Sequence, residues 1–124
     1  MEGRSYTDLL IWQRSRQLAN AVYQSTQDFP QKEVFGLTSQ IRRSAVSIPS
    51  NIAEGCGRQH AKDAISFFYI ARGSLYELET QLYLSFDQRF LSEETLNTLL
   101  QQITDCKKLL HGFINHYKSK LGAS

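Results

Sequence analysis

The chain has 124 residues, the length of a single domain, and we treat residues 1–124 as one domain. Hydrophobic residues make up 41% and charged residues 21% of the sequence, a composition that excludes a largely disordered chain. The formal net charge of +2 is far below the basic excess typical of dedicated nucleic-acid binders, unless assembly gathers the charge on one surface.

The sequence predicts neither a signal peptide nor a membrane span. It begins with polar residues, and its longest unbroken apolar run covers only residues 67–71. The two cysteines, Cys56 and Cys106, form neither a disulfide framework nor a zinc motif. We therefore expect a cytoplasmic protein that has no membrane partner.

The first predicted helix covers about residues 8–28 and ends before Pro30, because the residue before a proline is disfavoured in helical geometry. The second covers about residues 33–54, and we expect Pro49 to kink it without breaking it. Its apolar stripe keeps one phase across the proline: Leu37, Ile41, Ala45, Ile48 and Ile52.

Glycines at 55 and 57 predict a turn with left-handed backbone after the second helix. The third helix is predicted over 61–86, and Ser92 is a good N-cap for a fourth helix that continues to about residue 120. The third helix carries a seam spaced alternately by four and three residues: Ala64, Phe68, Ala71, Leu75, Leu78, Leu82 and Ser85.

Four long helices with short connections predict an all-α, up-down-up-down four-helix bundle. Gly73 and Gly112 lie inside the third and fourth predicted helices, where each costs about 1 kcal/mol relative to alanine. We expect that the glycines allow these two helices to approach closely, which would offset that cost.

The residues that could carry chemistry have ordinary structural interpretations. His111 and His116 are five residues apart, so a helix turns them away from each other, and residues 55–58 match no phosphate-binding pattern. Nothing in the sequence fixes Cys56 near His60 as a nucleophile and base. We predict no enzymatic activity, no cofactor, no metal site and no small-molecule substrate.

Carboxylates on the predicted second and third helices need partners. Glu77 lies on a face that also holds apolar side chains, where a carboxylate is expected to find a partner or shift its pKa. Arg42 and Arg43 are the natural candidates, and we favour a structural network over acid–base catalysis. The predicted polar network comprises Gln40, Arg42, Arg43, Asn51, Glu54, Glu77 and Glu79.

A second stripe follows the third predicted helix beside the core seam. Tyr69, Tyr76 and Tyr83 are spaced by seven residues, with Arg72 and Glu79 between them. Three interpretations are open: a subunit interface, a wide bundle core, or stacking with the bases of a nucleic acid. We favour the interface and predict self-association through Tyr69, Arg72, Tyr76 and Tyr83.

Charges divide unevenly between the two ends of an up-down bundle. The connections 28–36 and 87–94 share an end that is acidic by three, whereas the opposite end is basic by one and includes Arg4. Ordinary solvated surface charges account for this mild charge asymmetry as well as a binding partner would. A cyclic oligomer, however, would join the basic ends of its subunits into one patch. The candidate nucleic-acid contacts there are Arg58, Lys62, Lys118 and Lys120.

Four segments, 9–13, 36–45, 47–55 and 73–82, resemble signature blocks of the bacterial four-helix-bundle proteins named after 23S rRNA intervening sequences. The resemblance extends over nearly the whole chain, and QIRRSAVSIPSNIAEG at 40–55 is a highly specific block.

The resemblance implies a left-handed bundle that assembles into a ring, a homopentamer, without known enzymatic activity. Some members are encoded within intervening sequences of rRNA genes, and relatives are basic accessory proteins of reverse transcriptases in retroelements. This chain differs in its low net charge and in Cys56, where an aromatic residue is common. We therefore favour a non-enzymatic homo-oligomeric interaction protein, and an RNA- or DNA-binding accessory protein is the alternative.

Overall fold

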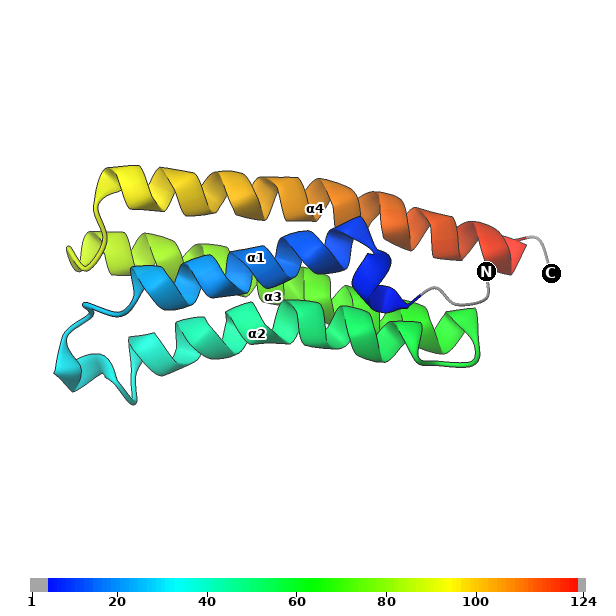
Figure 1. Ribbon diagram of the computed structural model, residues 1–124, viewed down its shortest axis with the longest axis horizontal. Helices are drawn as coiled ribbons and strands as arrows, with labels where there is room; N and C mark the ends of the chain where they lie inside the picture. The colour runs from blue at the N-terminus through cyan, green and yellow to red at the C-terminus, as the bar shows by residue number, and fades with distance from the viewer. Residues whose placement is uncertain (1–4, 123–124) are drawn as a thin grey trace.

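The computed structural model describes residues 5–122, and these fold entirely into helices and connecting turns without a strand. Figure 1 shows that the connections alternate between the two ends of an elongated bundle, so the helices run up, down, up and down. The all-helical prediction is confirmed. The elements are the 3-10 helix η1 (Tyr6–Asp8), α1 (Leu10–Ser25), the 3-10 helix η2 (Gln31–Glu33), α2 (Leu37–Cys56), α3 (Ala61–Asp87) and α4 (Glu93–Gly122).

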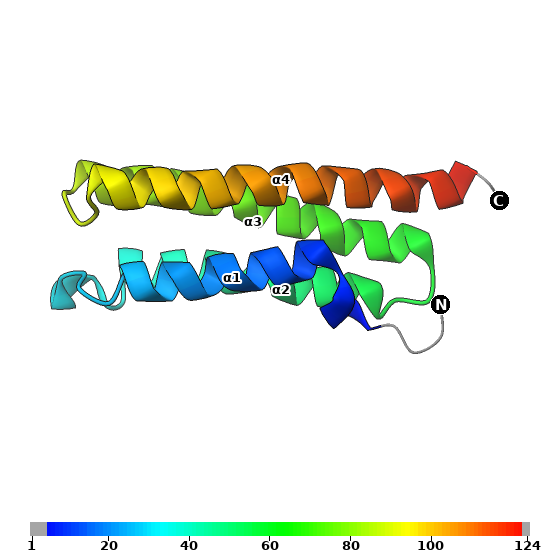
Figure 2. The same cartoon turned by 45° about the horizontal axis from the view of Figure 1, so that its top comes forward.

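Each helix lies beside two others: α1 and α3 each pack between α2 and α4. Figure 2 shows the bundle as two layers, α1 with α2 and α3 with α4. Every residue of the predicted α3 seam is buried, and the predicted stripe of α2 is buried from Ile41 to Ile52. The helical periodicity therefore identified the core-facing sides of these helices correctly.

Two helices begin later than the sequence predicts because 3-10 turns precede them. Ser5 and Asp8 form a capping box around η1, and the extended Leu9 then starts α1. The carboxylate of Glu33 in η2 accepts a hydrogen bond from the Leu37 backbone N–H at 3.1 Å and caps α2 from outside. Ser92 caps α4 as predicted, since its Oγ accepts the Thr95 N–H at 3.1 Å.

Gly55 has a different role from the one predicted. Helix α2 continues through Pro49 and Gly55 to Cys56, and Gly57 has an ordinary φ of −82°, so the expected left-handed turn is wrong. A Cβ on Gly55 would lie 2.5 Å from a ring carbon of Phe68 and 2.9 Å from the Ala64 carbonyl oxygen. Glycine is needed here because α2 and α3 approach closely.

Gly73 and Gly112 do not mediate a close approach between α3 and α4, and this prediction is also wrong. Both glycines are exposed, and a Cβ on either would meet nothing within 4 Å. Each therefore weakens its helix without a packing return inside the subunit. For the described part of the chain, no helix is both long and apolar enough to cross a bilayer.

Candidate interaction surfaces

Small polar residues, chiefly serines, join α2 to α3. Ser44 Oγ donates to Glu77 Oε1 at 3.0 Å, and the hydroxyls of Ser47 and Ser74 lie 2.8 Å apart. Asn51 Nδ2 donates to the carbonyl oxygen of Ser47 at 2.8 Å and to its Oγ at 2.9 Å. Two predicted network residues, Asn51 and Glu77, thus lie along this contact. The roles of Ser44 and Ser47 were not predicted from the sequence, although both residues adjoin the apolar stripe of α2.

Arg42 and Glu79 are not partners, because they face different neighbouring helices. Arg42 Nε donates to Thr26 Oγ1 at the end of α1 at 2.9 Å. Glu79 instead forms an ion pair with Lys107 of α4, with 2.9 Å between Oε1 and Nζ, and both side chains are partly buried. The prediction that Arg42 or Arg43 pairs with a carboxylate of α3 is wrong for Arg42, which bonds on the α1 side of α2, whereas Glu79 bonds on the α4 side of α3.

The remaining predicted network residues lie on the surface. Glu54 pairs with Arg58 one turn later at 3.1 Å, and Gln40 and Arg43 are exposed. Within residues 5–122 the ion pairs are Glu54–Arg58 and Glu79–Lys107, so neither Arg42 nor Arg43 pairs with a carboxylate there. The prediction of a single polar network is therefore wrong, and its residues instead make separate contacts on three sides of the bundle.

The four predicted interface residues lie along the α3 side that faces α4. The ring of Tyr69 is partly buried, with the Arg72 guanidinium carbon 4.7 Å and the Lys118 Nζ 5.4 Å from its centroid. Lys107 Nζ lies 4.0 Å from the centroid of Tyr76. Such cation–π contacts hold a tyrosine stripe beside positive charge. The stripe comprises Tyr69, Arg72, Tyr76 and Tyr83.

Helix α3 also exposes two aliphatic side chains, Ile70 and Leu84, that belong to none of the predicted sets. Ile70, Tyr76, Tyr83 and Leu84 each expose between 47% and 54% of their surface, and Gly73 lies among them. We call these five residues the α3 outer face. An apolar row of this kind on one helix is typical of a surface that another molecule covers.

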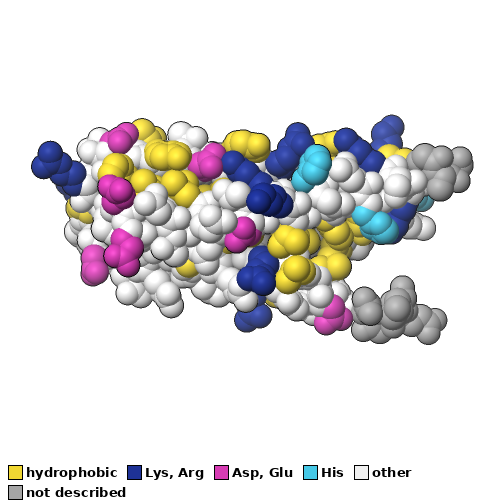
Figure 3. All heavy atoms as spheres, turned by 90° about the horizontal axis from the view of Figure 1, so that it is seen from above, with side chains coloured by type: hydrophobic (Ala, Val, Ile, Leu, Met, Phe, Trp, Pro, Cys, Tyr) yellow, Lys and Arg dark blue, Asp and Glu magenta, His cyan; other side chains and the backbone are white. Residues whose placement is uncertain are grey.

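The four candidate nucleic-acid contacts gather at the end of the bundle where α2 meets α3 and α4 finishes (Figure 1). On the face drawn in Figure 3, most Asp and Glu lie toward the opposite end and most Lys and Arg over the middle and this end. Arg4 lies outside the described residues. Three of the four cations contact aromatic rings of their own chain. The Arg58 guanidinium carbon lies 4.4 Å from the Phe67 ring centroid, and Lys120 Nζ lies 4.5 Å from the Tyr117 ring centroid. Lys118 contacts Tyr69, as described above.

The two cysteine thiols are free, with Cys106 buried and Cys56 partly buried. Cys56 shares a hydrogen bond with Tyr117, and burial raises the pKa of both groups. Burial, followed by the charge of Asp105, raises the pKa of Cys106 to about 11. A raised pKa lowers the thiolate fraction, which disfavours nucleophilic chemistry at either thiol.

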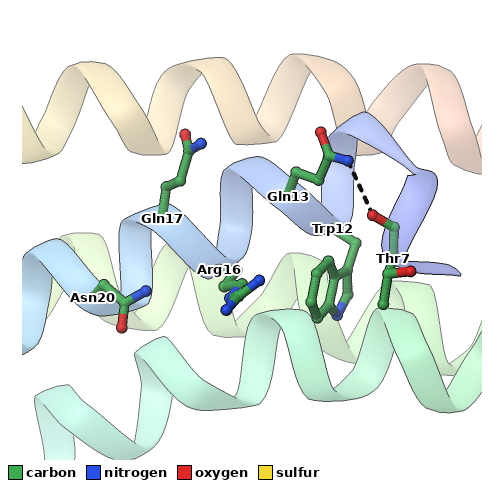
Figure 4. A pocket seen from close by; sticks show the side chains of 6 residues that line it. All are labelled: Thr7, Trp12, Gln13, Arg16, Gln17 and Asn20. Carbon is green, nitrogen blue, oxygen red and sulfur yellow. Dashed lines mark hydrogen bonds between the residues drawn. The ribbon is translucent and has the colours of Figure 1, made fainter.

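The depression in Figure 4 lies on the outer side of α1 beside η1 and has a volume of about 410 Å³. One of its polar groups is occupied locally, since Gln13 Nε2 donates to the Thr7 carbonyl oxygen at 3.0 Å. The Arg16 guanidinium carbon lies 5.5 Å from the Trp12 ring centroid. The lining residues are Thr7, Trp12, Gln13, Arg16, Gln17 and Asn20, so amides and one guanidinium are the groups that a ligand would meet there.

Comparison with known proteins identifies the family. A family model described as 23S rRNA-intervening sequence protein matches residues 7–112. The chain belongs to the 23S rRNA-intervening sequence protein family. A crystal structure of a protein of unknown function from the S23 ribosomal protein family of Bacteroides thetaiotaomicron is similar, with 26% sequence identity and a TM-score of 0.76. That similarity covers 85% of this chain and 98% of that chain, and no curated protein matches the chain.

The family region of this 23S rRNA-intervening sequence protein begins in η1 and ends in α4. It includes the whole α3 outer face and the polar contacts between α2 and α3. Lys118 and Lys120 lie beyond it, so two of the four candidate nucleic-acid contacts are outside the matched region.

Proposed function

We propose that this chain is a non-enzymatic homo-oligomeric interaction protein whose subunits associate through α3. The α3 outer face carries the proposal, because four large apolar side chains stand about half exposed on one helix. Tyrosine and arginine, which lie together at Tyr69 and Arg72, are enriched at protein interfaces.

Gly73 supports the same proposal. An exposed glycine in a helix interior costs about 1 kcal/mol relative to alanine, and a Cβ here would contact nothing in the subunit. A helix of another subunit can approach the backbone closely at such a position. The glycine therefore fits an interface better than it fits an isolated bundle.

We further propose a cytoplasmic ring of five subunits. The family resemblance carries the subunit number, and the two free thiols fit a reducing compartment. The raised pKa of Cys56 and of Cys106 argues against nucleophilic catalysis at either thiol.

Multi-angle light scattering on the purified full chain tests association. We expect a mass several times the subunit mass of 14.2 kDa, and five times that mass for the ring. The double substitution Tyr76→Ser and Tyr83→Ser should lower that mass. Leu10→Ser is the matched control, since Leu10 of α1 is 49% exposed and lies off the proposed interface. Equal loss in both variants would contradict a role for α3.

A nucleic-acid-binding accessory protein is the second candidate, favoured by the four cations gathered at one end of the bundle. Binding to phosphates must weaken steeply as salt rises, because counterions are released. In a gel shift with RNA and with DNA, Lys62→Glu with Lys118→Glu should weaken binding, whereas Lys32→Glu at the other end should not. The absence of a shift at low salt would exclude this candidate.

A further inference from the structure

A groove on the opposite side of the bundle from α4 combines apolar walls with positive charge. It runs between the end of α1, η2 and the first half of α2 and has a volume of about 370 Å³. We call it the Arg42 groove. Its lining includes Tyr23, Val34, Thr38, Arg42, Arg43 and Val46.

The floor of the groove is held in place by the subunit itself. Arg42 Nε donates to Thr26 Oγ1, and the guanidinium carbon lies 4.6 Å from the Tyr23 ring centroid. Thr38 is 7% exposed, and its Oγ1 has no hydrogen-bond partner among the described residues. A buried hydroxyl without a partner lowers stability, and a bound group that hydrogen-bonds to it removes that penalty.

The apolar walls of the groove and the charge of Arg43 are exposed and can contact another molecule. Tyr23, Val34 and Val46 are each between 41% and 43% exposed, and the adjacent Phe35 is 94% exposed. Arg43 is exposed and takes part in no ion pair within the described part of the chain. An occupant that places a carboxylate between apolar side chains would therefore complement the groove.

The chain carries such an arrangement on α3. Ile70, Glu77 and Leu84 are spaced by seven residues, so they form a nearly straight row with about 10 Å between neighbours. All three are exposed. Glu77 accepts one hydrogen bond from Ser44, a neutral group, and forms no ion pair among residues 5–122. Its charge is thus unneutralised between two exposed aliphatic side chains.

We propose that the Arg42 groove of one copy of this chain receives the Ile70–Glu77–Leu84 row of a second copy, with Arg43 facing Glu77. This inference rests on the proposed function and adds the surface that α3 contacts. The two surfaces differ, so the contact is head-to-tail, and repetition of a head-to-tail contact closes a ring when its rotation allows. An acidic partner protein on the groove is the competing occupant, which the test below separates.

Sedimentation velocity on the full chain, with charge reversals on each surface, tests the pairing. Arg43→Glu and Glu77→Arg should each weaken association at least about tenfold, because each places like charges opposite one another. The double variant should associate within about threefold of the unaltered chain, since the pair is restored with reversed sign. The two single variants should also associate when mixed, and association of the mixture would show that neither substitution had acted by unfolding the chain.

Lys108→Glu is the control for Arg43→Glu, since it makes the same change in net charge on an exposed position of α4. It should leave association unchanged. Phe35→Ser should weaken association without lowering thermal stability, because Phe35 buries almost nothing in the subunit.

The possible failures are distinguishable. An unaltered chain that stays monomeric overturns the proposed function together with this inference. Association that Arg43→Glu leaves intact overturns this inference alone and assigns the groove to another occupant. Loss in both single variants without rescue in the double variant would also contradict a direct Arg43–Glu77 contact.

Discussion

At the scale of single residues, Gly55 decides how closely α2 and α3 pack. The ring of Phe68 and the carbonyl oxygen of Ala64 occupy the space that a Cβ would need. We predict that Gly55→Ala lowers the free energy of unfolding by about 1–3 kcal/mol, the range for overpacking a core. Gly57→Ala is the matched control, since its Cβ would lie 3.5 Å from the nearest atom. Chemical denaturation of both variants measures the difference, and equal effects would contradict this role of Gly55.

Cys106 links stability to alkaline pH. Its folded pKa of about 11 lies above the ordinary thiol value of 9.0, so the unfolded chain loses this proton first. The resulting stabilisation is fully present below pH 9.0 and is lost as the pH rises toward about 11. We predict that the unfolding free energy of Cys106→Ala falls less steeply over this range than that of the unaltered chain. Parallel pH profiles from urea titrations would contradict the assignment.

At the scale of elements, the end of α3 contains a strained residue. Arg89 has a φ of 66°, the only positive φ among the described non-glycine residues. The Phe90 N–H bonds to the Ser85 carbonyl oxygen and the Arg89 N–H to that of Phe86, which completes a Schellman motif.

We predict that Arg89→Gly raises the free energy of unfolding by about 1 kcal/mol, because glycine adopts the left-handed conformation without a Cβ clash. Gln88→Gly is the control, since Gln88 has an ordinary φ of −79°. Thermal unfolding of both variants measures the contrast. A gain at position 88 or a loss at position 89 would argue against strain at Arg89.

Gly73 and Gly112 provide a matched pair on α3 and α4. Each is exposed in a helix with open space around its Cβ position, so alanine at either should raise subunit stability by about 0.5–1 kcal/mol. We predict that Gly73→Ala also weakens self-association and that Gly112→Ala does not. Unfolding in denaturant gives the first quantity and sedimentation the second. Unchanged association in Gly73→Ala would remove the argument that a second helix approaches there.

The helices and their buried faces were predictable because a periodic apolar pattern directly records which side avoids water. The seam of α3 from Ala64 to Ser85 is the clearest case. The starts of α1 and α2 were not predictable from that pattern, since η1 and η2 depend on local caps such as Ser5 and Glu33.

The pairing of polar side chains was the least predictable feature. Arg42 has the reach to meet a partner on either neighbouring helix, and only the arrangement in space places it on Thr26 rather than on a carboxylate of α3. The same holds for Glu79, whose partner Lys107 is 28 residues away on α4. The spacing of the tyrosines showed that they share one side of α3. Ile70 and Leu84 could be assigned to the α3 outer face only from their exposure in the structure.

At the scale of the whole molecule, residues 5–122 enclose one covered interior and expose apolar side chains on the α3 outer face and in the Arg42 groove. Both surfaces would be partly withdrawn from water by a head-to-tail contact, at roughly 25 cal/mol for each Å² of apolar area covered. The uneven distribution of charge along the bundle in Figure 3 would then be repeated around a ring. The account as a whole therefore depends on association between copies.

Sedimentation equilibrium of the unaltered chain across the micromolar range is the most direct measurement of that claim. The account predicts a mass that is a multiple of the 14.2 kDa subunit and that falls in Gly73→Ala but not in Gly112→Ala. A single species at the subunit mass over the whole range would contradict it.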